Sequence, residues 1–474
     1  MANNSSILGE LDSEDLQNRG LLGPSHSTGS RRIHKRRLHR SSSEEYSDIS
    51  LDVRTDSADA ASAFATIPIT LISYDTLGYL GLAVDKANAI WSEWTHWPAT
   101  GPRREIDADD GGLQVTFLDF IVARLENYED VFEDNDAQWR QCLIVCGINE
   151  SVQDAIMDPI FKDIRLTNSC VYWVKDTLAM RYAGLEDIRR ASHRREKELV
   201  NASARPGGSH SDNSSNRGSG RGGNVQEHSP AKGKATSQGR RSVSGLQQQT
   251  TPGISPQFWN SKTAVDIDNQ PGNIVLFKGI DQGRITGLFN ERGEVQSIEK
   301  LLSMPRSDFS STRALFYFTP DCHIAEYYAA YAKRRSNCES VVMVSMSIPR
   351  EAINNLEEPD IRRLYWPSPH WKQLVWRSKT AKPLPKPLRS YRDALLIIGT
   401  ISKGAERLFE NFKTWEDMTD ACVLRVRSSN RSNPSEQYVF SGEEEGREFL
   451  NQHGKIQVFP FSEAELQTLL SRYG

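Results

Sequence analysis

Long apolar runs and cysteine are scarce in this chain of 474 residues, and each absence excludes a class of protein. No stretch approaches the about 18–20 consecutive apolar residues that a membrane helix requires. The N-terminus has no basic region followed by an apolar run, so we expect no secretory signal. The six cysteines lack the spacing of a disulfide framework or a zinc site. We therefore expect a soluble intracellular protein with no membrane span and no metal site.

Apolar residues make up 37% of the chain, fewer than the about 45–50% of a typical globular domain. Part of the chain is therefore expected to build no core. The net charge of −4 excludes a uniformly basic nucleic-acid binder, so any basic surface must be local.

The composition divides the chain into four parts. Residues 1–65 and 200–257 are polar and have no sustained apolar period, which predicts disorder. Residues 66–199 carry apolar residues at spacings of three and four, which predicts a mostly helical domain. In residues 258–474, strand patterns interleave with helical ones without a regular βαβ period, which predicts a mixed α+β domain. The expected fold class of the whole chain is α+β.

Individual elements are also predicted. A helical stretch is expected over residues 70–97, where Trp91, Trp94 and Trp97 lie near one face and are typical of a core or an interface. Cys142 and Cys146 lie in a segment that fits either a strand or a buried helix, and we expect them to be reduced and buried. A long helix is expected at 171–200. In the C-terminal part, strands are expected at 273–280, 314–320, 339–349, 391–401, 437–442 and 455–461.

The sharpest local signal is RRIHKRRLHR at residues 31–40, a strip of cations without an acid. Its cations are Arg31, Arg32, Lys35, Arg36, Arg37 and Arg40. An extended strip of this kind fits the acidic groove of a nuclear import receptor, which predicts a nuclear protein. Two other interpretations stay open: the strip lies along phosphates, or it is a solvated run of charge.

The segment 200–257 is basic as well as polar. Between residues 201 and 252 it has seven Arg or Lys and two acids, and Arg217 and Arg221 lie in an arginine–glycine stretch. Such segments make weak contacts with RNA or DNA, although a plain spacer is the simpler interpretation. Neither globular part contains a recognition helix, a zinc-finger spacing or an aromatic RNA-binding motif.

The motifs NIVLFKGI, ALFYFTPDCHIAEYYAAYA and VVMVSMSIP make the C-terminal part resemble ADP-ribosyltransferase-like domains. The resemblance implies that Lys278 stands where the family has the Arg or His that holds nicotinamide adenine dinucleotide (NAD). It places Thr319 near the family's hydroxyl position and gives Tyr317 and Tyr328 as stacking faces. The cofactor that it implies is NAD.

The expected catalytic carboxylate is missing from this pattern. QYVFSG is similar to the family's last strand, but Gln437 occupies the carboxylate position and Glu436 stands beside it. A neutral amide cannot stabilise a cationic ribosyl transition state, and one lost electrostatic contact of this kind costs about 10²–10³ in rate. Lysine also lacks the planar donor geometry of arginine. The resemblance therefore supports the fold more than the activity, and an NAD-binding pseudoenzyme remains an alternative.

The whole arrangement is also similar to a family of filamentous-fungal proteins, the hypoxia-responsive morphology factors of aspergilli. The shared features are the basic strip and the segments FYFTPD, EYYAAYAKRR, WRS and YVFSGEEEGREFL. This resemblance implies a nuclear regulator that alters the expression of other genes and hence colony or hyphal form. The expected partners are an import receptor and other regulatory proteins, with weak nucleic-acid contact through the tail and the linker.

These observations lead to one leading hypothesis and two alternatives. The leading hypothesis is a nuclear, non-enzymatic regulator. The first alternative is an ADP-ribosyltransferase-like enzyme with Lys278, Thr319 and Glu436 or Gln437 in its site; it requires those positions to converge on one cleft. The second is an RNA-associated adaptor, which would bind with a steep dependence on salt.

Overall fold

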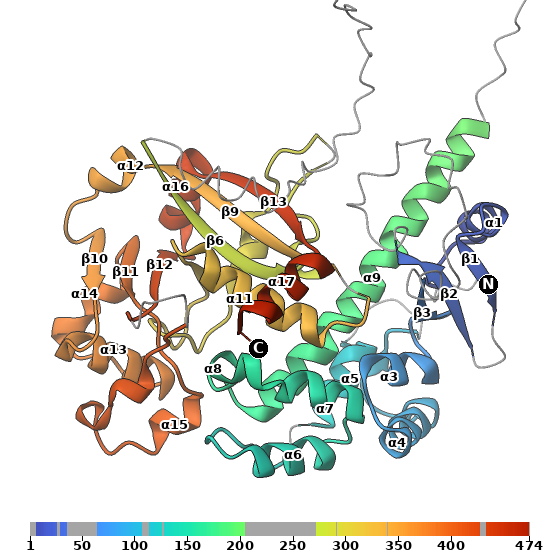
Figure 1. Cartoon of the computed structure of the whole chain (residues 1–474), viewed down its shortest axis with the longest axis horizontal. Helices are drawn as coiled ribbons and strands as arrows, with labels where there is room; N and C mark the ends of the chain where they lie inside the picture. Colours follow the sequence, from blue (N-terminus) through green and yellow to red (C-terminus); the bar gives the residue numbers. More distant parts are fainter. Residues whose placement is uncertain are drawn as a thin grey trace, which may run out of the picture.

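A computed structural model describes residues 6–25, 29–35, 64–106, 113–125, 128–203, 272–290, 292–338, 340–426 and 433–473. Its helices and sheets give the mixed α+β class that the sequence predicts. Apart from residues 200–203, the linker expected at 200–257 lies outside the described residues. Figure 1 shows a helical part, blue to green, beside a part built on sheets, yellow to red.

A small layer of helix and sheet precedes the helical part, where the sequence predicts a disordered tail. Helix α1 (Glu10–Asn18) is followed by an antiparallel sheet in the order β1 (Leu22–Ser25), β2 (Ser30–His34), β3 (Phe64–Pro68). Asp12 fastens α1 to the long helix α9 (Cys170–Ser203), because its carboxylate accepts hydrogen bonds from Ser192 and Arg195. The prediction of disorder is therefore wrong for residues 6–25 and 29–35. The other residues before 64 lie outside the described ranges.

The helical part packs around α9. Its elements are α3 (Tyr74–Leu80), α4 (Val84–Thr95), β4 (Arg103–Arg104), β5 (Gln114–Val115), α5 (Phe117–Ala123), α6 (Asp136–Val145), α7 (Glu150–Met157) and α8 (Lys162–Arg165). The helical stretch expected at 70–97 is two helices, because Gly81 adopts φ +110° and ends α3. Trp94 is buried beside Phe117, as expected of a core residue. Cys142 and Cys146 are buried free thiols, and their segment is helical.

In the described residues of the C-terminal part, six strands match predicted ones, and the strands Leu302–Ser303 and Ile361–Leu364 are not predicted. One sheet has the order β13-β9-β6 and the other β10-β11-β12-β8-β7. The strands are β6 (Asn273–Asp281), β7 (Leu302–Ser303), β8 (Leu315–Phe318), β9 (Val341–Pro349), β10 (Ile361–Leu364), β11 (Leu396–Thr400), β12 (Glu436–Ser441) and β13 (Lys455–Phe461). An isolated antiparallel bridge between Phe277 and Thr319 joins the two sheets, because the backbones exchange hydrogen bonds of 2.7 and 2.9 Å.

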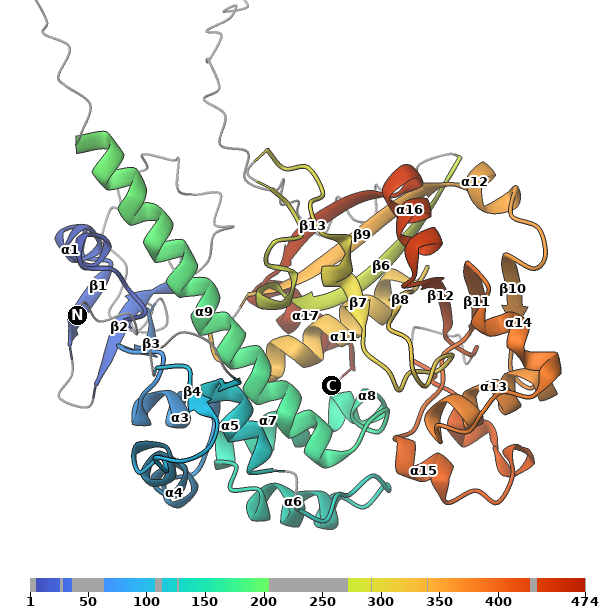
Figure 2. The ribbon, with the colours of Figure 1, turned by 180° about the vertical axis from the view of Figure 1, so that it is seen from behind.

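Helices cover these sheets. They are α11 (Cys322–Arg335), α12 (Arg350–Asn354), α13 (Pro369–Lys379), α14 (Arg389–Arg392), α15 (Glu406–Glu410), α16 (Glu444–His453) and α17 (Glu463–Tyr473). Short 3-10 turns include η4 (Gln282–Ile285) after β6 and η5 (Ile298–Leu301) before β7. Figure 2 shows α11 lying between the β6-β9-β13 sheet and the helices of the N-terminal part.

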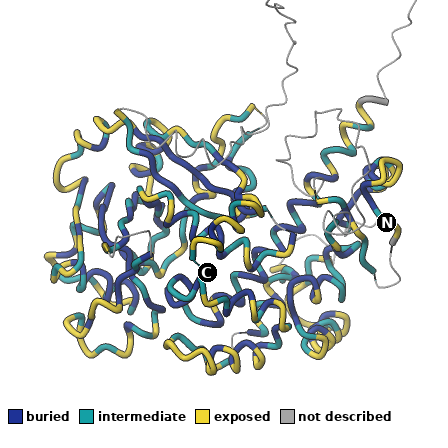
Figure 3. Tube along the Cα trace, in the orientation of Figure 1, coloured by how far each residue is buried: buried dark blue, intermediate teal, exposed yellow. Residues whose placement is uncertain are grey.

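One hydrophobic core runs through both parts of the chain. It includes residues from α1 to α9 together with residues of α11, β6, β9, β13 and α17. At its centre the ring of Trp173 lies 4.9 Å from that of Tyr331, and the ring of Phe161 lies 5.5 Å from that of Tyr327. Figure 3 shows this buried region continuing from α9 into α11. The 200–257 segment thus separates the two parts in sequence but not in packing.

Gly279 allows the close approach of α11 to β6. A Cβ atom at this position would lie 2.4 Å from the carbonyl oxygen of Ala325 and 2.7 Å from the nitrogen of Ala329. Both atoms belong to the helix backbone, so no side-chain rotation relieves the clash. The glycine of the FKGI motif is therefore explained by helix packing.

We expect Gly279→Ala to lower the free energy of unfolding by about 1–3 kcal/mol, because overpacking must push α11 away from the sheet. Gly78→Ala is the matched control: its added Cβ meets no atom within 4 Å, and it lies inside a helix, where alanine is favoured. Thermal unfolding measures both variants. Equal melting temperatures for the two would contradict the packing role of Gly279.

Candidate functional site

Lys278 lies on β6 as a half-buried side chain that holds two structural elements together. Its Nζ donates to the carbonyl oxygen of Leu301 at 2.8 Å and to Oγ of Ser303 at 3.0 Å. Burial, together with the nearby cation Arg284, lowers the pKa of Lys278 to about 8. The amine therefore ties β6 to the start of β7.

Thr319 is adjacent to Lys278 in the sheet but points to its other face. Thr319 pairs with Phe277, and cross-strand partners share a face while neighbours along a strand alternate. Phe277 packs in the core with α11, whereas Lys278 reaches Leu301 on the opposite side. The Thr319 hydroxyl accepts from the backbone N–H of Asp321 at 3.2 Å, just before α11.

Gln437, at the position where the resemblance places a catalytic carboxylate, is buried in a polar cluster around Asp308. Its Nε2 donates to Oδ2 of Asp308 at 2.9 Å and faces the carbonyl oxygen of Thr400 at 3.3 Å. The same carboxylate accepts from the backbone N–H and hydroxyl of Ser402 at 2.7 and 2.6 Å. It also pairs with Nζ of Lys379 at 3.2 Å.

The Asp308 cluster explains why position 437 carries an amide. Asp308 is 8% exposed and Gln437 is 4% exposed, so both lie out of bulk water. The amide supplies a donor that the carboxylate of Asp308 accepts. A second carboxylate here would face Asp308 with no proton between them, and like charges at this distance disfavour ionisation. The surroundings of Asp308 therefore favour a neutral residue at position 437.

Glu436 points away from this cluster, since neighbours on a strand alternate. Its Oε1 accepts from the hydroxyl of Tyr365 at 2.8 Å. Burial raises the pKa of Tyr365, and the hydrogen bond to Glu436 raises it further. Glu436 therefore does not stand in for the missing carboxylate at position 437.

The two tyrosines that the resemblance offers as stacking faces have structural roles. Tyr317 donates to Oγ of Ser307 at 2.8 Å and accepts from the N–H of Phe309 at 3.2 Å. Tyr328 packs against the core that the two parts of the chain share. Burial raises the pKa of both hydroxyls, and Asp308 raises it further, so both stay neutral at pH 7.

The structure therefore brings only part of the predicted set together. Phe318 and Tyr438 are paired on neighbouring antiparallel strands; Thr319 follows Phe318 and Gln437 precedes Tyr438, so Thr319 and Gln437 share a face. Lys278 lies on the opposite face, and Glu436 is bonded to Tyr365. The single cleft that the enzyme hypothesis requires for these residues does not form.

The basic strip begins inside the small sheet of the N-terminal layer. Arg31 and Arg32 belong to β2, where they pair with Ile67 and Thr66 of β3. Arg32 and Lys35 are exposed, and the guanidinium of Arg32 lies 5.3 Å from the ring centroid of Phe64. The remaining cations, Arg36, Arg37 and Arg40, lie outside the described residues.

Comparison with known proteins adds nothing to this geometry. No protein-family model, no curated protein and no solved structure matches the chain. In the described ranges, no group of three or more His, Cys, Asp or Glu side chains is placed to hold a metal ion. None of the helices that the structure describes is long and apolar enough to cross a membrane.

Two features of the structure escape sequence reasoning. The first is a network around Asp176 on α9, whose carboxylate accepts from Arg284 and Arg335 at 2.7 Å each. The second is a cavity between α9 and the loop after η4. Their residues come from both parts of the chain, so no local spacing reveals them. The only sequence signal is that α9 continues as a helix with closely spaced arginines.

Proposed function

We propose that this protein is a nuclear, non-enzymatic regulator that modulates the expression of other genes and thereby colony or hyphal form. The observation that carries the proposal is the strip at residues 31–40, with six cations and no acid. Such a strip matches what an import receptor binds in its acidic groove. The partners of the folded part are other regulatory proteins, and the tail and linker add weak contacts to nucleic acid.

The site geometry supports the non-enzymatic half of the proposal. An amide stands at the expected carboxylate position, and its Nε2 is bonded to Asp308. The lysine at the dinucleotide-holding position is bonded to Leu301 and Ser303 on the other face of the sheet. An enzyme of the ADP-ribosyltransferase class needs these groups to meet at one ribose.

We propose that the nuclear address, meaning the segment that an import receptor binds, lies after Arg32. An import receptor binds an extended segment, and the backbone of Arg31 and Arg32 is already paired within a sheet. We therefore assign the address to the four cations from residue 35 onward. They are Lys35, Arg36, Arg37 and Arg40.

The location of the tagged full-length chain tests this assignment. Changing Lys35, Arg36, Arg37 and Arg40 to Ala should remove the nuclear signal, because four of the six cations are lost while β2 is untouched. The matched control removes four cations from the linker: Arg217, Arg221, Lys232 and Lys234 to Ala. It should remain nuclear. If the native chain is cytoplasmic, or the strip variant is nuclear, these four cations are not a nuclear localisation signal.

The alternatives are separated by two simpler assays on the full-length chain. Incubation with labelled NAD should give neither hydrolysis nor label transfer if the protein is non-enzymatic. Turnover that disappears in Lys278→Met would instead establish the enzyme. Binding to RNA with a steep salt dependence would favour the RNA-associated adaptor.

A further inference from the structure

A cavity lies where α9 of the helical part meets the loop that follows β6. Its volume is about 60 Å³, whereas one water-sized probe needs about 10–15 Å³. It therefore has room for a group of several heavy atoms. Residues of α9, η4, the following loop and β13 line it.

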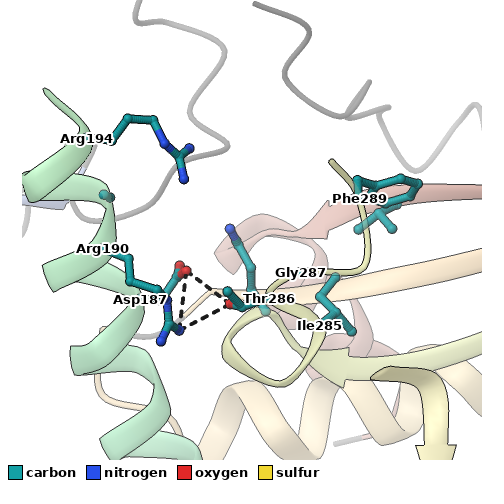
Figure 4. A pocket seen from close by; sticks show the side chains of 10 residues that line it. Asp187, Arg190, Arg194, Ile285, Thr286, Gly287 and Phe289 are labelled. Atoms are coloured by element: carbon teal, nitrogen blue, oxygen red, sulfur yellow. Dashed lines mark hydrogen bonds and ion pairs between the residues drawn. The ribbon is translucent and has the colours of Figure 1, made fainter. Parts of the chain in front are cut away.

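One wall of the cavity carries two arginines a single helical turn apart. Arg190 and Arg194 both line it from α9, and residues at this spacing share a helix face. Figure 4 shows Arg194 reaching from α9 toward the open space, with Phe289 on the far side and Thr286 and Gly287 between them. The wall is therefore cationic, and the facing loop is short and turned.

Among the residues that the structure describes, none balances the charge on Arg194. Within the ranges that the structure describes, its guanidinium has no hydrogen bond or ion pair. Nη2 of Arg190 donates a hydrogen bond of 3.2 Å to Oγ1 of Thr286 and lies 3.9 Å from Oδ1 of Asp187. Its Nη1 lies 3.9 Å from Glu186. Both guanidinium groups thus keep donors for a ligand.

The other residues that line the cavity indicate which further groups a ligand could carry. The Thr286 hydroxyl donates to Asp187 at 3.2 Å and accepts from Arg190 at 3.2 Å. The carboxylate of Asp187 also lines the cavity, so one acid accompanies the two arginines. Ile285, Phe289 and Val458 contribute apolar surface. The arrangement combines forked donors with an adjacent apolar surface, and forked guanidinium donors match the oxygens of a phosphoryl group.

We propose that this cavity binds a phosphoryl group, carried either by free phosphate or by the monoester of a small apolar group. The anion lies against Arg190 and Arg194, and the organic group, where there is one, covers Phe289 and Ile285. Because its walls come from both parts of the chain, the ligand bridges α9 and the β6 loop. This site is distinct from the positions Lys278, Thr319 and Gln437, and it does not depend on the nuclear address.

Calorimetric titration of the full-length chain with inorganic phosphate and with phenyl phosphate, at constant ionic strength, tests this proposal. Arg194→Ala should weaken binding about tenfold, the effect of one charge-assisted hydrogen bond. Lys197→Ala is the matched control, because it removes one exposed cation of the same helix outside the cavity and should bind as the native chain does. Tighter binding of phenyl phosphate identifies a monoester as the ligand, and equal binding identifies free phosphate.

Two results would contradict the proposal that this cavity binds a phosphoryl group. One is the absence of saturable binding of either anion to the native chain. The other is equal weakening by Arg194→Ala and Lys197→Ala, which would show that only net charge matters. Arg194→Lys separates the two effects further, since it keeps the charge but loses the fork. It should bind more weakly than the native chain and more tightly than Arg194→Ala.

Discussion

Asp176→Ala should lower the free energy of unfolding by about 3–5 kcal/mol, the cost of leaving a buried charge without its partner. Asp176 accepts from Arg335 of α11 and from Arg284 of η4. Arg335 is 3% exposed, and its guanidinium lies 4.6 Å from the ring centroid of Trp173 and 4.5 Å from that of Tyr331. Without the carboxylate, this cation stays buried beside two rings, and the two parts of the chain lose the ion pairs that Asp176 forms with Arg335 and Arg284.

The matched control for Asp176→Ala is the same substitution in an exposed ion pair. Asp154 pairs with Arg140 at 2.8 Å, and both side chains are about half exposed. Asp154→Ala should therefore cost less than about 1 kcal/mol. Calorimetric melting of both variants makes the comparison. Similar losses in the two would contradict the role of the Asp176 network.

The same carboxylate also predicts how stability depends on pH. Burial acts to raise the pKa of Asp176, but Arg284 and Arg335 outweigh it and lower the pKa from 3.8 to about 2. The unfolded chain therefore takes up this proton at a higher pH than the folded chain does. The stabilisation from Asp176 is complete at neutral pH and is lost as the pH falls through 3.8 toward about 2. Asp176→Asn should show a shallower acid dependence than the native chain.

Asp308→Ala should have a comparable effect, about 3–5 kcal/mol, within the C-terminal part. Asp308 pairs with Lys379, which is 8% exposed, and accepts from Ser402 and Gln437. Its loss removes the acceptor of a buried ammonium group and of three further donors, two on Ser402 and one on Gln437. The double variant Asp308→Ala with Lys379→Met should recover much of the loss, because it removes the uncompensated charge.

A double-mutant cycle on Asp308 and Lys379 provides the measurement for this second prediction. If Asp308 and Lys379 stabilise each other, the cycle should show a clear coupling energy between the two positions. Additive losses would show that the pair does not organise the cluster. Asp393→Ala is the control, since Asp393 forms an exposed pair with Arg392 at 2.9 Å and should cost little.

The sequence predicts the elements of the C-terminal part well, because strongly apolar strands such as β9 and β11 carry a local signal. It fails for the N-terminal layer. Ile7, Leu16 and Ile33 are buried there but stand too far apart to form a period. Helix α1 packs against α9, more than a hundred residues away, and no local pattern records such a contact.

The candidate site is predicted only in its residues and not in its geometry. Gln437 stands out as an amide in the sequence, but the acceptor that explains it, Asp308, lies 129 residues away. Lys278 and Thr319 lie close together in the sheet, yet the pairing of Thr319 with Phe277 puts them on opposite faces. Strand pairing between distant segments decides these facts, and spacing along the chain does not.

The proposal that this protein acts in the nucleus without catalysis is tested by measuring the transcript abundance of the genes that it regulates. Cells would carry the native chain, the variant with Lys35, Arg36, Arg37 and Arg40 changed to Ala, or Lys278→Met combined with Thr319→Val. We expect the strip variant to lose the native chain's effect on transcript abundance, while the Lys278 and Thr319 variant keeps that effect. If the strip variant still changes transcript abundance and the Lys278 and Thr319 variant does not, the protein is not a non-enzymatic nuclear regulator.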